Sequence, residues 1–141
     1  MHTRLSRAEV PIDQTWNLDD LFVSDADWEA ELAAVDAARD TVSPYQGRLL
    51  EGAATLLACL NSVEALEQRF VRVSTFAHLR NAQDGTNPQS QSAMARVDAL
   101  EARLGASIAF VDSEILQLPD GALEQFLASE PGLAEIGRAH V

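Results

Sequence analysis

Apolar residues recur along most of the chain at intervals of three and four, which is the spacing of helices with one buried face. Two long segments, 62–83 and 88–111, show this spacing most clearly. Their apolar positions are Val63, Leu66, Phe70, Val73 and Ala77 in the first segment, and Val97, Leu100, Leu104 and Val111 in the second, with Met94 and Ile108 beside them. Because only a short turn separates the segments, the sequence predicts a long antiparallel helical hairpin.

Capping residues and helix breakers predict where the helices before and within this hairpin begin. Ser24 is a suitable N-cap for a helix over about 25–41. A separate short apolar helix is predicted over 53–60, with Asn61 as the N-cap of the long helix that follows. Asn87, directly before Pro88, is predicted to cap the second long helix.

The two ends of the chain show weaker patterns. Residues 1–23 are predicted to form an irregular N-terminal arm. Its apolar residues, together with the first tryptophan of the next helix, are expected to form an exposed surface for a partner: Trp16, Leu18, Leu21, Phe22 and Trp28. After the hairpin, 113–118 is predicted as a helical turn, and Pro119 is predicted to start a further helix. The domain assignment is therefore one helical domain over 24–134.

Composition and charge narrow the class of protein. Alanine occurs 23 times and β-branched residues are sparse, which favours an all-α fold. Ten arginines, no lysine and 22 acidic residues give a net charge of −12, which disfavours partners such as nucleic acid or an anionic membrane surface. The single cysteine excludes an internal disulfide, and no apolar stretch is typical of a membrane span or secretory signal. A cytoplasmic location is therefore expected.

Residues able to carry catalysis are scarce. His2, His78 and His140 lack the spacing of a zinc site, and Cys59, among apolar neighbours, is interpreted as a small core residue. The sequence therefore predicts no catalytic, cofactor-binding or metal-binding residue.

Charged segments allow two interpretations each. Residues 19–40 contain eight acids and one arginine, which indicates either a solvated helix face or an acidic wall that favours basic ligands. Three arginines in the first long segment could bind a ligand carboxylate, or pair with Glu67 or a neighbouring helix: Arg69, Arg72 and Arg80.

Five short motifs occur in an order that resembles oligoendopeptidase F, a family of zinc metallopeptidases of the thimet-oligopeptidase-like group. The motifs extend over about residues 10–134. They are Val10-Pro11 with Thr15-Trp16-Asn17-Leu18-Asp19-Asp20-Leu21-Phe22, the early helical Trp28, Tyr45-Gln46-Gly47-Arg48-Leu49, Asp84-Gly85-Thr86-Asn87-Pro88, and Phe110-Val111-Asp112-Ser113-Glu114-Ile115-Leu116-Gln117-Leu118-Pro119.

The resemblance implies a zinc enzyme that hydrolyses oligopeptides through an HExxH site in a catalytic domain, with an N-terminal helical region in the wall of the substrate channel. No residue of this chain matches the metal or catalytic residues of the family. We therefore expect an inactive N-terminal fragment whose partner is the missing C-terminal catalytic domain. The alternative is a stand-alone helical protein–protein interaction module.

The last residues, 135–141, are interpreted as a non-native tail. Ile136–Val141 match one reading frame of a common short-read sequencing adapter. A natural frayed tail is the alternative.

Overall fold

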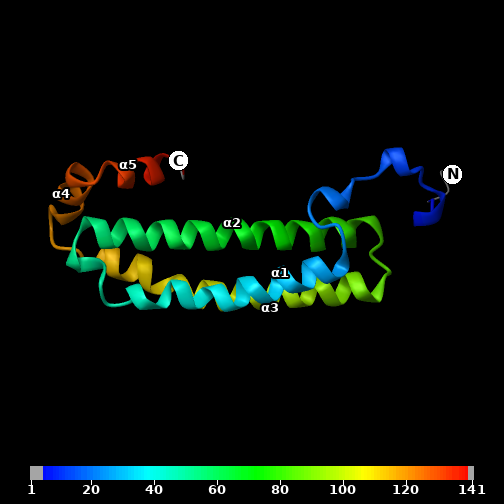
Figure 1. The fold of residues 1–141 in the computed structure, drawn as a ribbon, viewed down its shortest axis with the longest axis horizontal. Helices are drawn as coiled ribbons and strands as arrows, with labels where there is room; N and C mark the ends of the chain where they lie inside the picture. Colours follow the sequence, from blue (N-terminus) through cyan, green and yellow to red (C-terminus); the bar gives the residue numbers. More distant parts are fainter. Residues whose placement is uncertain (1–4, 140–141) are drawn as a thin grey trace.

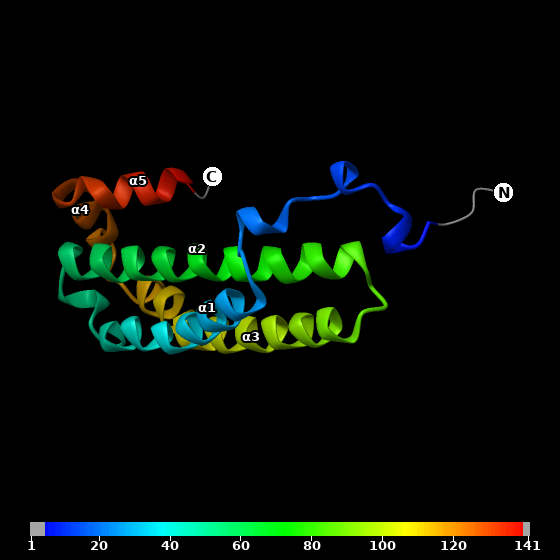
Figure 2. The same ribbon diagram turned by 45° about the vertical axis from the view of Figure 1, so that its right-hand side comes forward.

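The computed structural model describes residues 5–139, and this part of the chain is all-α with no strand, as the sequence predicts. Two long helices, α2 (Ala53–Gln83) and α3 (Pro88–Leu116), lie side by side and antiparallel (Figure 1). Helix α1 (Asp25–Ala38) packs along both, which makes a three-helix bundle. Helices α4 (Ala122–Ser129) and α5 (Pro131–Ala139) turn back over one end of α2 (Figure 2).

The predicted N-caps of α1 and α3 are confirmed. Ser24 Oγ accepts a hydrogen bond from the Asp27 backbone N–H at 3.1 Å, and Asn87 Oδ1 accepts from the N–H groups of Gln89 and Ser90. Each cap satisfies backbone donors that the first helical turn leaves unpaired.

The predicted break at Asn61 is wrong, because α2 runs without interruption from Ala53 to Gln83. Neither proline nor glycine occurs within this helix. Ser62, next to the expected cap, donates its hydroxyl back to the Ala58 carbonyl at 3.0 Å, so its side chain bonds within the helix. A suitable capping residue does not end a helix whose apolar face continues on both sides.

Three other predicted boundaries are also wrong. Helix α1 ends at Ala38, and the predicted continuation is a separate turn of 3-10 helix, Arg39–Thr41. Helix α3 runs on to Leu116 and takes in most of the predicted turn over 113–118. Helix α4 starts at Ala122 rather than at Pro119, directly after Gly121 with φ of 80°. This left-handed backbone favours glycine and separates the proline from the helix.

The core lies between α1, α2 and α3. Both predicted seams contribute buried side chains: Leu66, Val73 and Ala77 from α2, and Val97, Leu100, Leu104 and Val111 from α3. Phe70 of the predicted seam is only partly buried. Helix α1 adds Trp28, Leu32 and Val35, which point inward.

The expected exposed apolar surface is mostly absent, because two of its three aromatic side chains belong to the core. Trp28 is 3% exposed and Phe22 is 7% exposed, and both rings pack on Phe76. The two phenylalanine rings meet edge to face at 5.4 Å. Only Trp16, at 57% exposure, remains largely open to solvent.

The N-terminal arm extends past the end of the bundle and contains three short 3-10 turns, Arg7–Glu9, Ile12–Gln14 and Leu18–Asp20 (Figure 1). It is tied to α2 by hydrogen bonds from Gln83 to the Trp16 carbonyl and from Arg72 to the Leu21 carbonyl.

The interpretation of 135–141 as a non-native tail stays a prediction. Helix α5 includes its residues up to Ala139, and residues 140–141 lie outside the described range.

Candidate functional site

Glu114, near the end of α3, holds the turn that precedes α2. Its carboxylate accepts the backbone N–H of Gly47 at 2.8 Å and that of Leu49 at 3.2 Å. Gly47 has a φ of 80°, where a side chain would strain the backbone, and Leu49 is fully buried. Two of the five motifs therefore meet in space, because one carboxylate satisfies two backbone donors of the turn.

Cys59 lies in the core and is not an activated nucleophile. Burial, with a smaller contribution from the charge of Glu114, raises the pKa of the Cys59 thiol to about 11. A thiol with so high a pKa stays protonated at neutral pH. The interpretation of Cys59 as a small core residue is confirmed.

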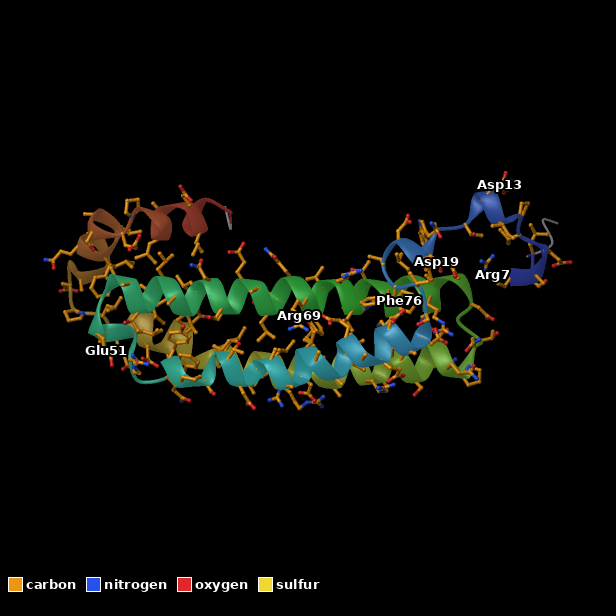
Figure 3. All side chains as sticks on the ribbon, viewed as in Figure 1. Arg7, Asp13, Asp19, Glu51, Arg69 and Phe76 are labelled. Carbon is orange, nitrogen blue, oxygen red and sulfur yellow. The ribbon has the colours of Figure 1, made fainter. Side chains whose placement is uncertain are left out.

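The acidic residues of α1 bind arginines on the two neighbouring helices. Asp25 pairs with Arg80 and Glu31 with Arg69, both from α2, while Glu29 pairs with Arg96 from α3. Figure 3 shows Arg69 on the side of α2 that faces α1. Asp36 accepts from Arg103 at 3.0 Å and from Arg39 at 2.7 Å.

Neither interpretation of the acidic segment 19–40 is therefore complete. Four of its eight acids serve as ion-pair partners between helices. For Arg69 and Arg80, pairing with a neighbouring helix is confirmed. Arg72 instead lies over the Phe22 ring, 4.7 Å from its centroid, and donates to a backbone carbonyl.

These pairs change the acidity of the carboxyl groups involved. Hydrogen bonds from Arg96, Arg69 and Arg103 lower the pKa values of Glu29, Glu31 and Asp36 respectively, against a smaller opposing effect of burial. A lowered pKa means that the charged form, and with it the ion pair, persists to lower pH than for a free carboxyl group.

His78 lies on the exposed side of α2, and its Nδ1 is 2.8 Å from the Ser74 carbonyl oxygen. Within residues 5–139, no group of three or more His, Cys, Asp or Glu side chains has the arrangement of a metal site. These residues do not fit the zinc ion that the resemblance implies, and no catalytic step is assigned to them. His2 and His140 lie outside the described range.

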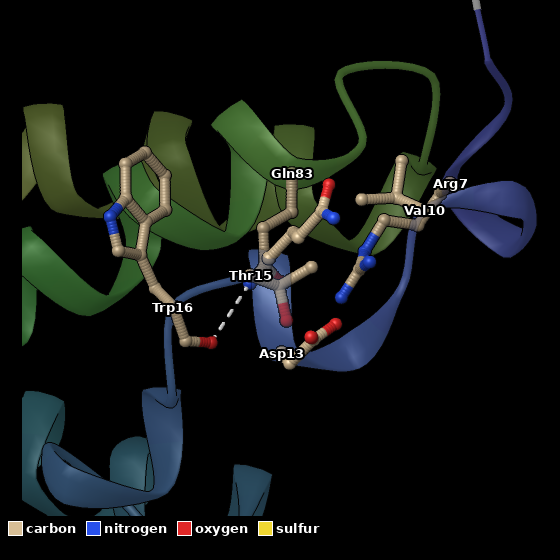
Figure 4. A pocket seen from close by; sticks show the side chains of 7 residues that line it. Arg7, Val10, Asp13, Thr15, Trp16 and Gln83 are labelled. Carbon is tan, nitrogen blue, oxygen red and sulfur yellow. Dashed lines mark hydrogen bonds between the residues drawn. The ribbon is translucent and has the colours of Figure 1, made fainter.

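The surface of the bundle has several hollows. One of about 540 Å³ lies between the N-terminal arm and the end of α2 (Figure 4). Two smaller hollows, of about 300 and 320 Å³, follow the groove between α1 and α3, and both include Glu29 and Arg96 in their walls. No helix of the described part is long and apolar enough to cross a membrane.

Comparison with known proteins relates this helical chain to bacterial oligopeptidases, although no family model matches it. It is 32% identical over 127 residues to oligopeptidase PepF of Bacillus subtilis, and 29% identical over 128 residues to the group B oligopeptidase PepB of Streptococcus agalactiae. The crystal structure of oligoendopeptidase-F from Enterococcus faecium matches 79% of this chain with a TM-score of 0.70 and 26% identity. The chain is thus a homologue of oligoendopeptidase F, and the resemblance based on the five motifs is confirmed.

The matched segment is most of this chain but a small part of each relative. It covers 90% of this chain but 19% of PepF, and 91% of this chain but 21% of PepB. The chain therefore spans about a fifth of the length of the curated relatives it matches.

Proposed function

We propose that this chain is the N-terminal helical part of a zinc-dependent oligoendopeptidase F-like enzyme that hydrolyses short peptides, and that its helices form part of the substrate-channel wall. The observation that carries this proposal is the homology over nine-tenths of the chain and about a fifth of each relative. The zinc ion and the catalytic residues belong to the remaining part, which is the partner of this chain. The single cysteine suits a reducing compartment, in support of a cytoplasmic location.

The bundle has the properties that a channel wall needs. Arginines from α2 and from α3 form ion pairs with carboxylates of α1. The buried Trp28 of α1 also donates a hydrogen bond to the backbone of α2. Side chains on helices fixed in this way keep their positions better than side chains on loops. A wall of this kind shapes a binding space without taking part in the chemistry.

A chimera tests the proposal. The segment of Bacillus subtilis PepF that matches this chain is replaced by the corresponding residues of this chain, and hydrolysis of a fluorogenic oligopeptide is measured with and without a chelator. We expect chelator-sensitive activity within about tenfold of the parent enzyme, because the fold of the replaced part is kept. A PepF variant that lacks the segment should be inactive.

Two controls make the result decisive. A second chimera with Val73→Asp places a charge in the core and should lose both the cooperative melt and the activity. A chimera that melts cooperatively, binds zinc and yet hydrolyses no peptide contradicts the wall role.

A stand-alone protein–protein interaction module remains the second candidate. Such a module would bind through exposed apolar side chains, of which Leu116 at 86% exposure is an example. The reading frame beyond the codon for Ala134 separates the two. An HExxH sequence a few hundred codons downstream supports the peptidase, and an early stop codon supports the module.

A further inference from the structure

The hollow between the N-terminal arm and α2 brings opposite charges and an exposed ring together. Its wall consists of seven residues: Arg7, Val10, Asp13, Gln14, Thr15, Trp16 and Gln83. Figure 4 shows the Arg7 guanidinium and the Asp13 carboxylate turned toward one another on one side of Gln83, with the Trp16 indole on the other side. The volume of about 540 Å³ lies within the range of small-molecule sites.

Arg7 differs from the seven other arginines whose side chains the structure describes. Six of them make ion pairs with carboxylates, and Arg72 binds a carbonyl and covers the Phe22 ring. Arg7 makes neither kind of contact with the side chains described over residues 5–136, although Asp13 faces it. In a chain with a net charge of −12, a guanidinium without an ion pair at the wall of a hollow is unusual.

Asp84 also lies near Arg7, but its carboxylate already accepts hydrogen bonds from Thr86. Its Oδ1 accepts hydrogen bonds from Thr86 N–H and from Thr86 Oγ1, at 3.1 and 2.6 Å. These hydrogen bonds lower the pKa of Asp84 most, and the charge of Arg7 contributes least. No ion pair joins Asp84 to Arg7 among the described side chains.

Local hydrogen bonds hold the walls in place. Ser6 and Glu9 form a reciprocal capping box around the turn that carries Arg7, with the Ser6 backbone N–H 2.6 Å from the Glu9 carboxylate. Thr15 Oγ1 donates to the Ile12 carbonyl at 2.8 Å, and Gln83 donates to the Trp16 carbonyl at 3.3 Å. The charged groups and the ring thus project from turns that are already closed.

We propose that this hollow binds a free α-amino acid with an apolar side chain, whose carboxylate lies on Arg7, whose ammonium lies on Asp13, and whose side chain packs against Trp16. An α-amino acid carries its ammonium and carboxylate groups on the same carbon atom, so it can bridge a guanidinium and a carboxylate that face each other without forming an ion pair. Val10 and the indole supply apolar surface for the side chain.

The charge of the whole chain selects the same ligand class. A net charge of −12 repels anions at long range, while Arg7 repels cations at the site itself. A zwitterion has no net charge and meets neither penalty. A ligand of about a dozen heavy atoms at an open site is expected to bind with a dissociation constant on the order of 1 mM.

The test follows the two indole N–H resonances of the 15N-labelled chain during titration with L-phenylalanine, assigned with Trp16→Phe. We expect the Trp16 resonance to shift with saturation, and the resonance of the buried Trp28 to stay fixed. N-acetylphenylalanine, which lacks the ammonium, and phenylalaninamide, which lacks the carboxylate, should each bind at least about tenfold more weakly. Glycylphenylalanine, with its charges farther apart, should also bind more weakly than phenylalanine.

Variants locate the site. Arg7→Gln and Asp13→Asn should each weaken phenylalanine binding by about tenfold or more. Arg48→Gln should leave it unchanged, because Arg48 pairs with Glu51 at the other end of the bundle (Figure 3). The melting temperature of each variant verifies that the bundle is intact, since Arg7 and Asp13 lie outside the core.

Three outcomes overturn the proposal. No shift of the Trp16 resonance up to about 20 mM phenylalanine excludes the site at the expected affinity. If the acetylated or amidated derivative binds as tightly as phenylalanine, the interaction is only contact with the exposed Trp16 ring. Tighter binding of the dipeptide assigns the hollow to a ligand with more widely spaced charges. The test does not involve peptide hydrolysis, so its outcome is independent of the proposed function.

Discussion

The indole Nε1 of Trp28 donates a hydrogen bond to the carbonyl oxygen of Val73 at 3.0 Å, across 45 positions of the sequence. Both residues are buried, and Val73 lies within α2, so the bond fastens α1 to the second helix from inside the core. The same ring stacks on Phe76 at 6.2 Å and lies under the Arg96 guanidinium. One side chain thus connects all three helices of the bundle.

Truncation of Trp28 should destabilise the bundle strongly. We expect Trp28→Ala to reduce the free energy of unfolding by about 3–5 kcal/mol, because it leaves a cavity and removes the hydrogen bond. Trp28→Phe should cost less, since the ring is partly replaced. Urea melts followed by circular dichroism measure both values. Trp16→Phe is the matched control, and a change above about 0.5 kcal/mol there would contradict the assignment of Trp16 as exposed.

Removal of the Glu114 carboxylate should release the turn before α2. Glu114→Ala leaves the N–H groups of Gly47 and Leu49 without their acceptor, which is expected to cost about 2–3 kcal/mol. Amide hydrogen exchange at these two positions should accelerate together with the loss of stability. Asp112→Ala, two positions earlier on the exposed side of α3, should behave like the parent chain. Equal effects of the two substitutions would refute the role of Glu114.

Arg72 should matter more than an ordinary surface residue. Its contacts with the Phe22 ring and the Leu21 carbonyl predict a cost of about 1 kcal/mol for Arg72→Ala. Gln68→Ala, one helical turn away on α2, should change stability by less than about 0.5 kcal/mol. Denaturant midpoints of the two variants decide the point, and coincident midpoints would show that Arg72 does not hold the arm.

Acid should weaken the ion pairs of α1. The folded-state pKa values of Glu29, Glu31 and Asp36 lie below their ordinary values near 4. Their contribution is therefore complete above those ordinary values and disappears as pH falls through the lowered ones. Urea midpoints from pH 6 to about pH 3 should fall in the parent chain and fall less steeply in Glu29→Gln. Parallel profiles would show that the Glu29–Arg96 pair contributes nothing to this dependence.

Cys59 should resist thiol reagents while the bundle is folded. Its thiol is fully buried and has a pKa of about 11, so neither access nor ionisation favours reaction. Labelling with a chromogenic disulfide reagent at pH 8 should proceed only at the rate of unfolding, and should be rapid in urea. Stoichiometric labelling within the mixing time in buffer would contradict the buried position.

The features that the sequence predicts are those set by neighbouring residues. Helical spacing predicts the two long helices, and Ser24 and Asn87 cap their helices because their acceptors reach backbone donors two or three positions away. Asn61 carries the same local signal, yet no cap forms there, since the packing of α2 continues through that position. A capping residue makes a helix boundary possible, but the packing of the helix determines whether the boundary forms.

The candidate sites depend on contacts that no local pattern contains. Glu114 reaches Gly47 across 67 positions, and Arg96 reaches Glu29 across the same separation. The sequence shows the excess of acidic residues over 19–40, but the arginines that bind them lie on two other helices. The hollow beside Arg7 likewise exists only because the arm lies next to Gln83.

The two interfaces of the bundle respond to different properties of the solvent. The seam between α2 and α3 is made of buried aliphatic side chains, whereas α1 adds four carboxylates with guanidinium partners at its margins. Dissolved salt screens pairs of this kind and leaves aliphatic packing almost untouched. Ionic strength therefore weakens only the margins of α1, while buried Trp28, Leu32 and Val35 keep this helix packed on the other two.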